Sequence, residues 1–143
     1  MCSPVTERTI AAVLDRFPRI GLFGPLHDNP NLPRWAVDDE RKHERRTLLR
    51  SAAQIERLAR WLKLVDPRRL RNRGPNGAKH LAESDTGLYF TEGMMLVAAV
   101  LVGHRWPTWY TGAAAPRFAN RFPSRKPIFA PSFASACCAA GRN

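Results

Sequence analysis

The chain contains nine apolar residues in a row, from Met94 to Val102. A run of this length is too short to cross a bilayer, which takes about 20 residues in a helix. Because a helix over this run would be apolar on nearly every side, neighbouring elements of the same protein must enclose it. Thr91 is a suitable N-cap residue. The sequence therefore predicts a buried helix from Glu92 to about Val102 at the centre of a core.

Hydrophobic periodicity predicts a long helix over residues 39–65. Asp38 or Asp39 can cap its start, and Pro67 ends it. At 1.5 Å per residue this helix would be a rod of roughly 40 Å. The apolar positions that fall within one stripe are Leu48, Ala52, Ile55, Leu58, Ala59, Leu62 and Val65. We expect Leu48, Ile55, Leu58 and Leu62 to pack with Met95, Val97, Ala98 and Leu101 in one core.

Local signals place further elements around these two helices. Ser3 as an N-cap followed by Pro4 predicts a helix over 4–17. Residues 18–37 are rich in Pro and Gly and predict a long surface loop with a short extended piece at 20–23, held by Leu22, Phe23 or Trp35. The segment 68–77 is predicted to be a basic loop that ends in a turn, 78–84 a short helix, and 85–87 a turn.

The predicted fold is therefore mainly α, with a helical domain over 1–104 and an extended, partly ordered tail over 105–143. The helices at 78–84 and 92–102 form a pair that resembles a helix-turn-helix. Its loop of about seven residues is longer than the usual three or four of a DNA-reading motif, which disfavours a sequence-specific repressor. The tail interleaves aromatic and arginine residues, and packing on the core is favoured over stacking on a single strand of nucleic acid.

The cysteines predict a reducing environment. Cys2, Cys137 and Cys138 lie at the ends of the sequence, and adjacent cysteines rarely bridge each other. The first residues lack the pattern of a secretion signal, and no apolar run is long enough to span a membrane. We therefore expect a cytoplasmic protein without a disulfide framework.

Positive charge is concentrated in residues 41–80, which hold 13 basic and 3 acidic side chains. Arginine exceeds lysine 19 to 4; guanidinium groups suit phosphate oxygens, although a GC-rich genome produces the same bias. The segment favours binding to nucleic acid, DNA or RNA. An acidic protein surface is the alternative partner, and a solvated face without a specific partner is the third possibility. The candidate phosphate-binding residues are Arg46, Arg50, Arg57, Arg60, Arg68, Arg69, Arg71, Arg73 and Lys79.

Known signatures of catalysis and metal binding are absent from the sequence. There is no G-x-S-x-G elbow, phosphate-binding P-loop or recognisable Cys–His pair, so no catalytic residue, metal ligand or cofactor is assigned. His80 and Glu83 share one helix face at i, i+3, a spacing that can hold a metal or pair an acid with a base. Without completing ligands nearby, a hydrogen bond within the helix is favoured, and contact of His80 with phosphate beside Lys79 is the alternative.

One stretch carries a family resemblance. It comprises Gly-Ala-Lys-His-Leu-Ala-Glu from Gly77, Gly-Leu-Tyr-Phe-Thr-Glu-Gly-Met-Met-Leu-Val-Ala-Ala from Gly87, and then Gly103. Over residues 77–104 the chain resembles short uncharacterised proteins carried by bacteria and their phages or plasmids. The resemblance implies a bacterial or mobile-element origin and assigns no activity.

These observations together predict a small, non-enzymatic, nucleic-acid-binding accessory protein. The alternative is a protein-interaction module, an inhibitor or adaptor whose basic face docks on an acidic protein surface. The sequence implies no membrane partner and leaves the oligomeric state open.

Overall fold

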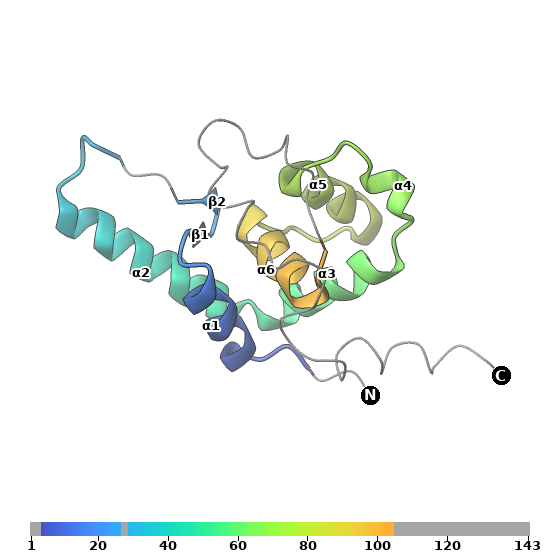
Figure 1. Ribbon diagram of the computed structural model, residues 1–143, viewed down its shortest axis with the longest axis horizontal. Helices are drawn as coiled ribbons and strands as arrows, with labels where there is room; N and C mark the ends of the chain where they lie inside the picture. Colours follow the sequence, from blue (N-terminus) through green and yellow to red (C-terminus); the bar gives the residue numbers. More distant parts are fainter. Residues whose placement is uncertain (1–3, 27–28, 105–143) are drawn as a thin grey trace.

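A computed structural model of the 143-residue chain describes residues 4–26 and 29–104. Within these residues the fold is mainly helical, as the sequence predicts, with six helices and one two-stranded hairpin (Figure 1). The three cysteines and the predicted tail of 105–143 lie outside the described residues.

Helix α6 (Glu92–Val102) lies at the centre of the fold, with the other elements around it (Figure 1). Its residues from Gly93 to Leu101 are all buried, so every side of the helix is covered. The hydroxyl of Thr91 accepts a hydrogen bond from the Met94 amide at 3.2 Å and caps the start. The prediction of an enclosed central helix is confirmed.

Three helices cover α6: α1 (Glu7–Arg16), α3 (Ala52–Leu64) and α5 (Pro75–Thr86). The contact between α3 and α6 is the most extensive of these. All eight predicted core residues are buried in one apolar cluster, which confirms the predicted core: Leu48, Ile55, Leu58, Leu62, Met95, Val97, Ala98 and Leu101.

Helix α1 begins at Glu7, three residues after the predicted start at Pro4. The reason is a reciprocal cap. The Thr9 amide donates to Thr6 Oγ1 at 3.3 Å, and the Thr6 amide donates to Thr9 Oγ1 at 3.0 Å. Two amide groups at the helix start are thereby satisfied by side chains, which outweighs the proline signal.

A small antiparallel hairpin, β1 (Ile20–Gly21) and β2 (Gly24–Pro25), occupies part of the predicted loop. Of the three residues predicted to hold this loop, Leu22 is buried, whereas Phe23 and Trp35 are 70% and 74% exposed. The hairpin docks on α6 through main-chain atoms, because the Gly93 amide donates to the Leu22 carbonyl at 2.9 Å.

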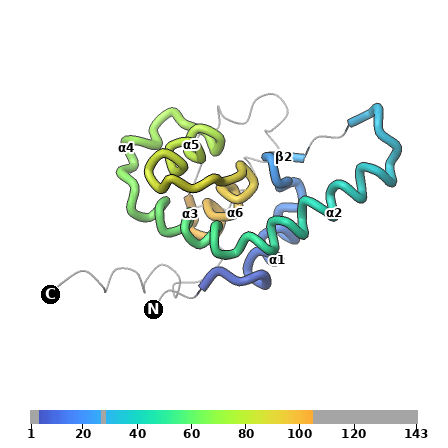
Figure 2. Tube along the Cα trace, turned by 180° about the vertical axis from the view of Figure 1, so that it is seen from behind, coloured from blue at the N-terminus to red at the C-terminus, as the bar shows by residue number. Residues whose placement is uncertain are grey.

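The predicted helix over 39–65 is wrong in one respect: it is two helices, α2 (Arg34–Arg50) and α3, separated by Ser51. The Ser51 hydroxyl donates to the Thr47 carbonyl at 2.7 Å, and the Ser51 amide donates to the Leu48 carbonyl at 3.1 Å. The side chain thus takes the acceptor that the amide uses in a continuous helix. The axis changes direction at this point (Figures 1 and 2), so no straight rod of 40 Å exists.

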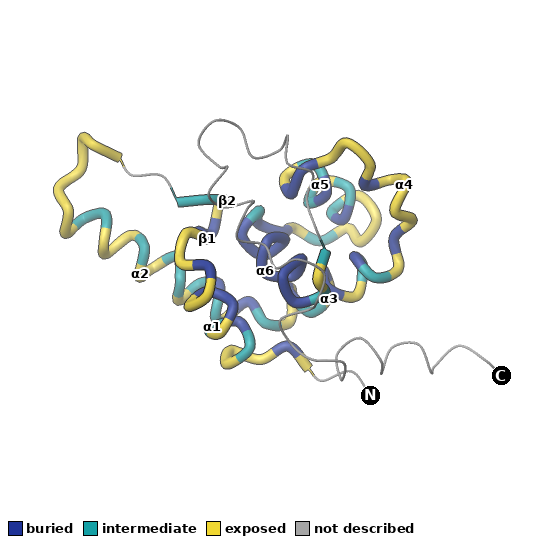
Figure 3. The backbone as a smooth tube through the Cα atoms, in the orientation of Figure 1, coloured by how far each residue is buried: buried dark blue, intermediate teal, exposed yellow. Residues whose placement is uncertain are grey.

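Helix α2 also begins earlier than predicted, at Arg34 with Pro33 as N-cap, so the expected acidic cap at Asp38 or Asp39 is not used. Of its 17 residues only Leu48 is buried. Figure 3 shows the N-terminal part of α2 extending away from the body with mostly exposed residues.

The segment after α3 is more helical than predicted. A short helix α4 (Pro67–Leu70) is capped by Asp66, whose side chain accepts from the Arg68 amide. Helix α5 starts at Pro75, which occupies the first helical position where its missing N–H is not needed. The predicted turn at 74–77 and helix at 78–84 are therefore one longer helix, which runs through Asp85 and Thr86 and ends at Gly87 with φ 69°.

The helix-turn-helix resemblance does not hold in three dimensions. Five residues, 87–91, connect α5 to α6. The second helix of a DNA-reading motif must expose one face to the major groove, but α6 is enclosed on all sides.

The close approach at Gly93 can be tested by Gly93→Ala. A Cβ at this position would lie 2.1 Å from the Gly21 carbonyl oxygen, so the hairpin would have to move. We expect a loss of about 1–3 kcal/mol or more in the free energy of unfolding, measured by urea denaturation. The matched control is Gly77→Ala in α5, whose Cβ would meet Arg73 at 3.4 Å, an ordinary contact. This control should stabilise the protein by up to about 1 kcal/mol; equal destabilisation by both variants would contradict the docking.

Candidate nucleic-acid interface

The outer side of α3 carries two of the predicted arginines. Because Ile55, Leu58 and Leu62 face the core, Arg57 and Arg60 face away from it. Arg60 Nη2 contacts Glu56 Oε1 at 2.5 Å, one turn earlier in the helix. Arg57 forms no ion pair within residues 4–26 and 29–104.

The last two turns of α2 present Arg46 and Arg50 to solvent. Arg46 Nε donates to the Lys42 carbonyl at 3.3 Å, which orients the side chain and leaves its charge uncompensated. Because the helix axis turns at Ser51, Arg46 and Arg50 do not lie on the same helix as Arg57. They lie on the helix that directly precedes α3 in the chain, and they do not continue the line of Arg57 as in one straight helix.

Three more of the predicted arginines lie on α4 and in the turn that follows it. Arg68, Arg71 and Arg73 are exposed. Arg73 Nε donates to the Arg69 carbonyl at 3.0 Å, and Asn72 between them adopts φ 60°. This conformation turns the chain between α4 and α5 while leaving the guanidinium groups outside.

Arg69 has a structural role. Its Nη1 and Nη2 atoms each donate to the carboxylate of Asp85 at 2.8 Å, and Trp61 Nε1 donates to the same carboxylate at 2.9 Å. The hydrogen bond with Asp85 raises the pKa of Arg69, and the hydrogen bonds from Arg69 and Trp61 lower the pKa of Asp85. Asp85 therefore joins α3, α4 and α5, and it holds α4 in place.

Lys79 is also engaged by a carboxylate. Its Nζ lies 3.6 Å from Glu83 Oε1 and 5.6 Å from the centre of the Tyr89 ring, and its side chain is largely covered. Glu83 Oε2 lies 2.9 Å from His80 Nδ1, which confirms the predicted hydrogen bond within the helix. Glu83 Oε1 accepts from the Phe90 amide at 3.0 Å.

Glu83 therefore fixes the connection between α5 and α6. Burial alone would raise its pKa, but the Phe90 amide, His80 and Lys79 together outweigh burial and lower it. The ionised carboxylate is the form that these partners stabilise.

The sequence thus named nine basic residues, and the structure divides them by their partners. Arg60, Arg69 and Lys79 face carboxylates. The other six lie exposed along α2, α3, α4 and the turn before α5, with no ion pair within the described part of the chain. We call these six the basic edge: Arg46, Arg50, Arg57, Arg68, Arg71 and Arg73.

Three arginines outside this set escaped the sequence analysis. Arg19, Arg34 and Arg41 line a hollow between the hairpin segment and α2. The i, i+7 spacing of Arg34 and Arg41 was the available signal, but it has meaning only once α2 is known to start at Arg34.

Among residues 4–26 and 29–104, no three His, Cys, Asp or Glu side chains gather in a way that could hold a metal ion. No helix in this part of the chain is both long and apolar enough to span a bilayer.

Comparisons of the chain with known proteins found no match to a protein-family model, a curated protein or a solved structure. The resemblance of residues 77–104 to short bacterial, phage-borne and plasmid-borne proteins stays a prediction.

The carboxylates of Asp85 and Glu83 make the stability of the fold depend on pH in the acidic range. Both have a pKa below the ordinary values of 3.8 and 4.5, so their contribution is present above those values and is lost as the pH falls through the lower, folded-state pKa. We expect the melting temperature to fall steeply below about pH 4. Asp85→Asn should lower the melting temperature at neutral pH and reduce that acid dependence.

The control for this experiment is Asp39→Asn, which removes one exposed carboxylate from α2. At neutral pH it should change the free energy of unfolding by less than about 0.5 kcal/mol. If Asp85→Asn and Asp39→Asn have the same effect at every pH, Asp85 does not join the three helices.

Proposed function

We propose that the protein is a small, non-enzymatic, nucleic-acid-binding accessory protein that contacts phosphate groups through the basic edge. The observation that supports this proposal most is the set of six exposed guanidinium groups on consecutive elements without carboxylate partners in the described residues. Such a set attracts a polyanion and releases counterions from it when it binds.

The paired cations support the edge rather than contact phosphate. Arg69 holds α4 through Asp85, so that Arg68 and Arg71 project from a fixed helix. Arg60 and Lys79 already face carboxylates, which reduces the attraction they offer to a phosphate. The contacts proposed are consequently fewer than the nine that the sequence suggested.

The mode of contact follows from the enclosure of α6. With no free recognition helix in the α5–α6 pair, the protein would bind along the phosphate backbone, where contacts carry little sequence information. Binding is therefore expected to be strongly dependent on salt and weakly dependent on sequence.

A protein partner with an acidic surface is the second candidate, and one residue favours it. Leu64 is 85% exposed at the end of α3, one and two turns after Arg60 and Arg57 on the same side. An exposed leucine beside arginines suits the apolar centre of a protein interface more than it suits a phosphate backbone.

Salt titration tests the first candidate. Each duplex phosphate contact contributes about 0.9 to the slope of log affinity against log salt. The double variant Arg50→Gln/Arg57→Gln should therefore flatten that slope by nearly two units in a fluorescence-anisotropy titration. Because both side chains are exposed, stability should change by less than about 0.5 kcal/mol per site.

The control is Arg8→Gln on α1, an exposed arginine outside the basic edge, which should leave the slope unchanged. An original protein that binds neither DNA nor RNA at low salt would eliminate this function.

A charge-preserving exchange separates the two candidates. Arg50→Lys/Arg57→Lys should retain nucleic-acid affinity within severalfold, because attraction to exposed phosphate depends mainly on charge. Leu64→Ser should leave nucleic-acid affinity unchanged, measured in the same titration. Loss of nucleic-acid binding in both of these variants would contradict contact through charge alone, and loss of binding to an acidic protein in both, with nucleic-acid affinity retained, would favour the protein interface.

A further inference from the structure

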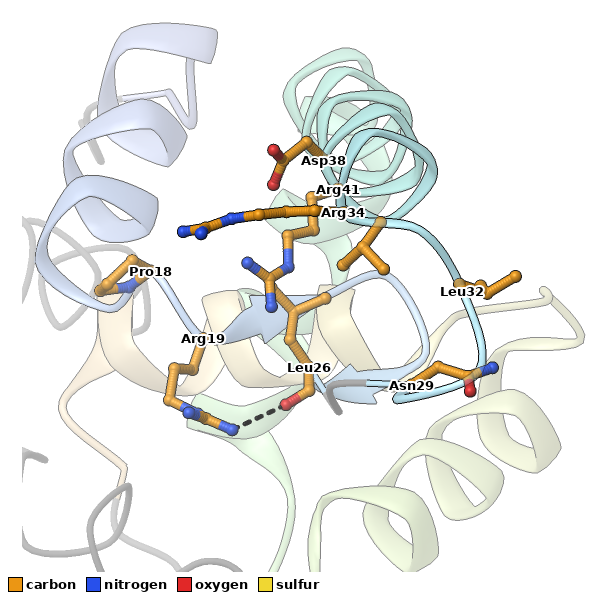
Figure 4. A pocket seen from close by; sticks show the side chains of 9 residues that line it. Pro18, Arg19, Leu26, Asn29, Leu32, Arg34, Asp38 and Arg41 are labelled. Carbon is orange, nitrogen blue, oxygen red and sulfur yellow. Dashed lines mark hydrogen bonds between the residues drawn. The ribbon is translucent and has the colours of Figure 1, made fainter.

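A second basic site lies away from the basic edge. A hollow of about 540 Å³ opens beside the N-terminal half of α2 (Figure 4). Its other wall is formed by residues that flank the hairpin on either side in the sequence. Its charged lining residues are Arg19, Arg34, Asp38 and Arg41, and its apolar lining includes Leu26, Leu32 and Val37.

The arginines reach this hollow from two directions. Arg34, Asp38 and Arg41 lie at i, i+4 and i+7, which places them on one side of α2. Figure 4 shows the guanidinium groups of Arg34 and Arg41 extending from α2 toward the side on which Pro18 and Arg19 lie. Arg19 Nη2 donates to the Leu26 carbonyl at 3.0 Å, which holds its charged end at the opposite wall.

Three cations and one carboxylate therefore line the same hollow. An anion placed in the hollow between Arg19 and Arg34 gains charge-assisted hydrogen bonds from their guanidinium groups. The planar guanidinium fork suits phosphate oxygens, and a phosphate monoester carries close to two negative charges at neutral pH.

The size and the apolar wall limit the ligand further. A volume of about 540 Å³ is within the roughly 300–1,000 Å³ of small-molecule sites and exceeds what inorganic phosphate fills. Leu26, Leu32 and Val37 can cover an organic group attached to the phosphate.

A smaller neighbouring hollow fixes the orientation. It shares Leu26, Val37 and Arg41 with the first and is also lined by Glu40 and Glu44. The acidic groups disfavour an anion there, so the phosphate belongs at the end with Arg19 and Arg34.

We infer that this hollow binds a phosphate monoester of nucleotide size, with Arg19 and Arg34 on the phosphate. The site is independent of the proposed function, because none of its residues belongs to the basic edge.

Isothermal titration of the full chain with AMP tests the inference. We expect a Kd of roughly 1 mM or tighter for AMP, at least about tenfold weaker binding of adenosine, and inorganic phosphate weaker than AMP. Arg34→Gln and Arg19→Gln should each weaken AMP binding about tenfold. Asp38→Asn should strengthen it severalfold, because it removes the only negative charge among the lining residues described for this hollow.

Two further variants separate this site from the basic edge. Arg8→Gln and Arg50→Gln/Arg57→Gln should leave AMP affinity unchanged. An oligonucleotide with a 5′-phosphate that binds more tightly than AMP, and more tightly than the same strand with a 5′-hydroxyl, would identify a nucleic-acid end as the source of the phosphate. Absence of AMP binding, equal binding of AMP and adenosine, or AMP affinity unaffected by Arg34→Gln and Arg19→Gln would overturn the inference.

Discussion

The backbone of Leu22 connects the central helix α6 to helix α2. Its carbonyl accepts the Gly93 amide at 2.9 Å, and its amide donates to Glu44 Oε2 at 2.8 Å. One residue of the hairpin therefore contacts the central helix α6 on one side and α2 on the other. The contact requires glycine at position 93, because a Cβ there would meet the Gly21 carbonyl oxygen. This contact acts together with the packing of α2 on α1 to position α2 and both groups of arginines on it.

The sequence predicted the elements that are governed by burial and missed those governed by local polar groups. The enclosed helix at 92–102 and the apolar side of α3 follow from side-chain hydrophobicity alone, and both are confirmed. The break at Ser51 depends on one hydroxyl competing for the Thr47 carbonyl, for which a period of 3.6 residues gives no signal. The nine candidate site residues were visible as charge, but their division was not, because the partner of Arg69 is Asp85, sixteen residues later.

The arginines consequently serve two physical purposes. A guanidinium group that faces a carboxylate, such as Arg69 on Asp85, connects two helices, here α4 and α5. A guanidinium group on an exposed turn without a carboxylate, such as Arg68 or Arg71, contributes little to folding and increases the self-repulsion of a chain with a net charge of +11. An anionic partner would relieve that repulsion, which is the energetic basis of both proposed sites.

Helix α2 carries residues of both sites, but on different sides. At 100° per residue, Arg46 and Arg50 point roughly 120–160° away from Arg34. The side with Arg34 and Arg41 continues to Leu48, which is buried, so it faces the hairpin and the core. The side with Arg46 and Arg50 faces solvent. A single phosphate group cannot contact both sides of one helix, so the two proposals, for the hollow and for the basic edge, require separate anionic groups.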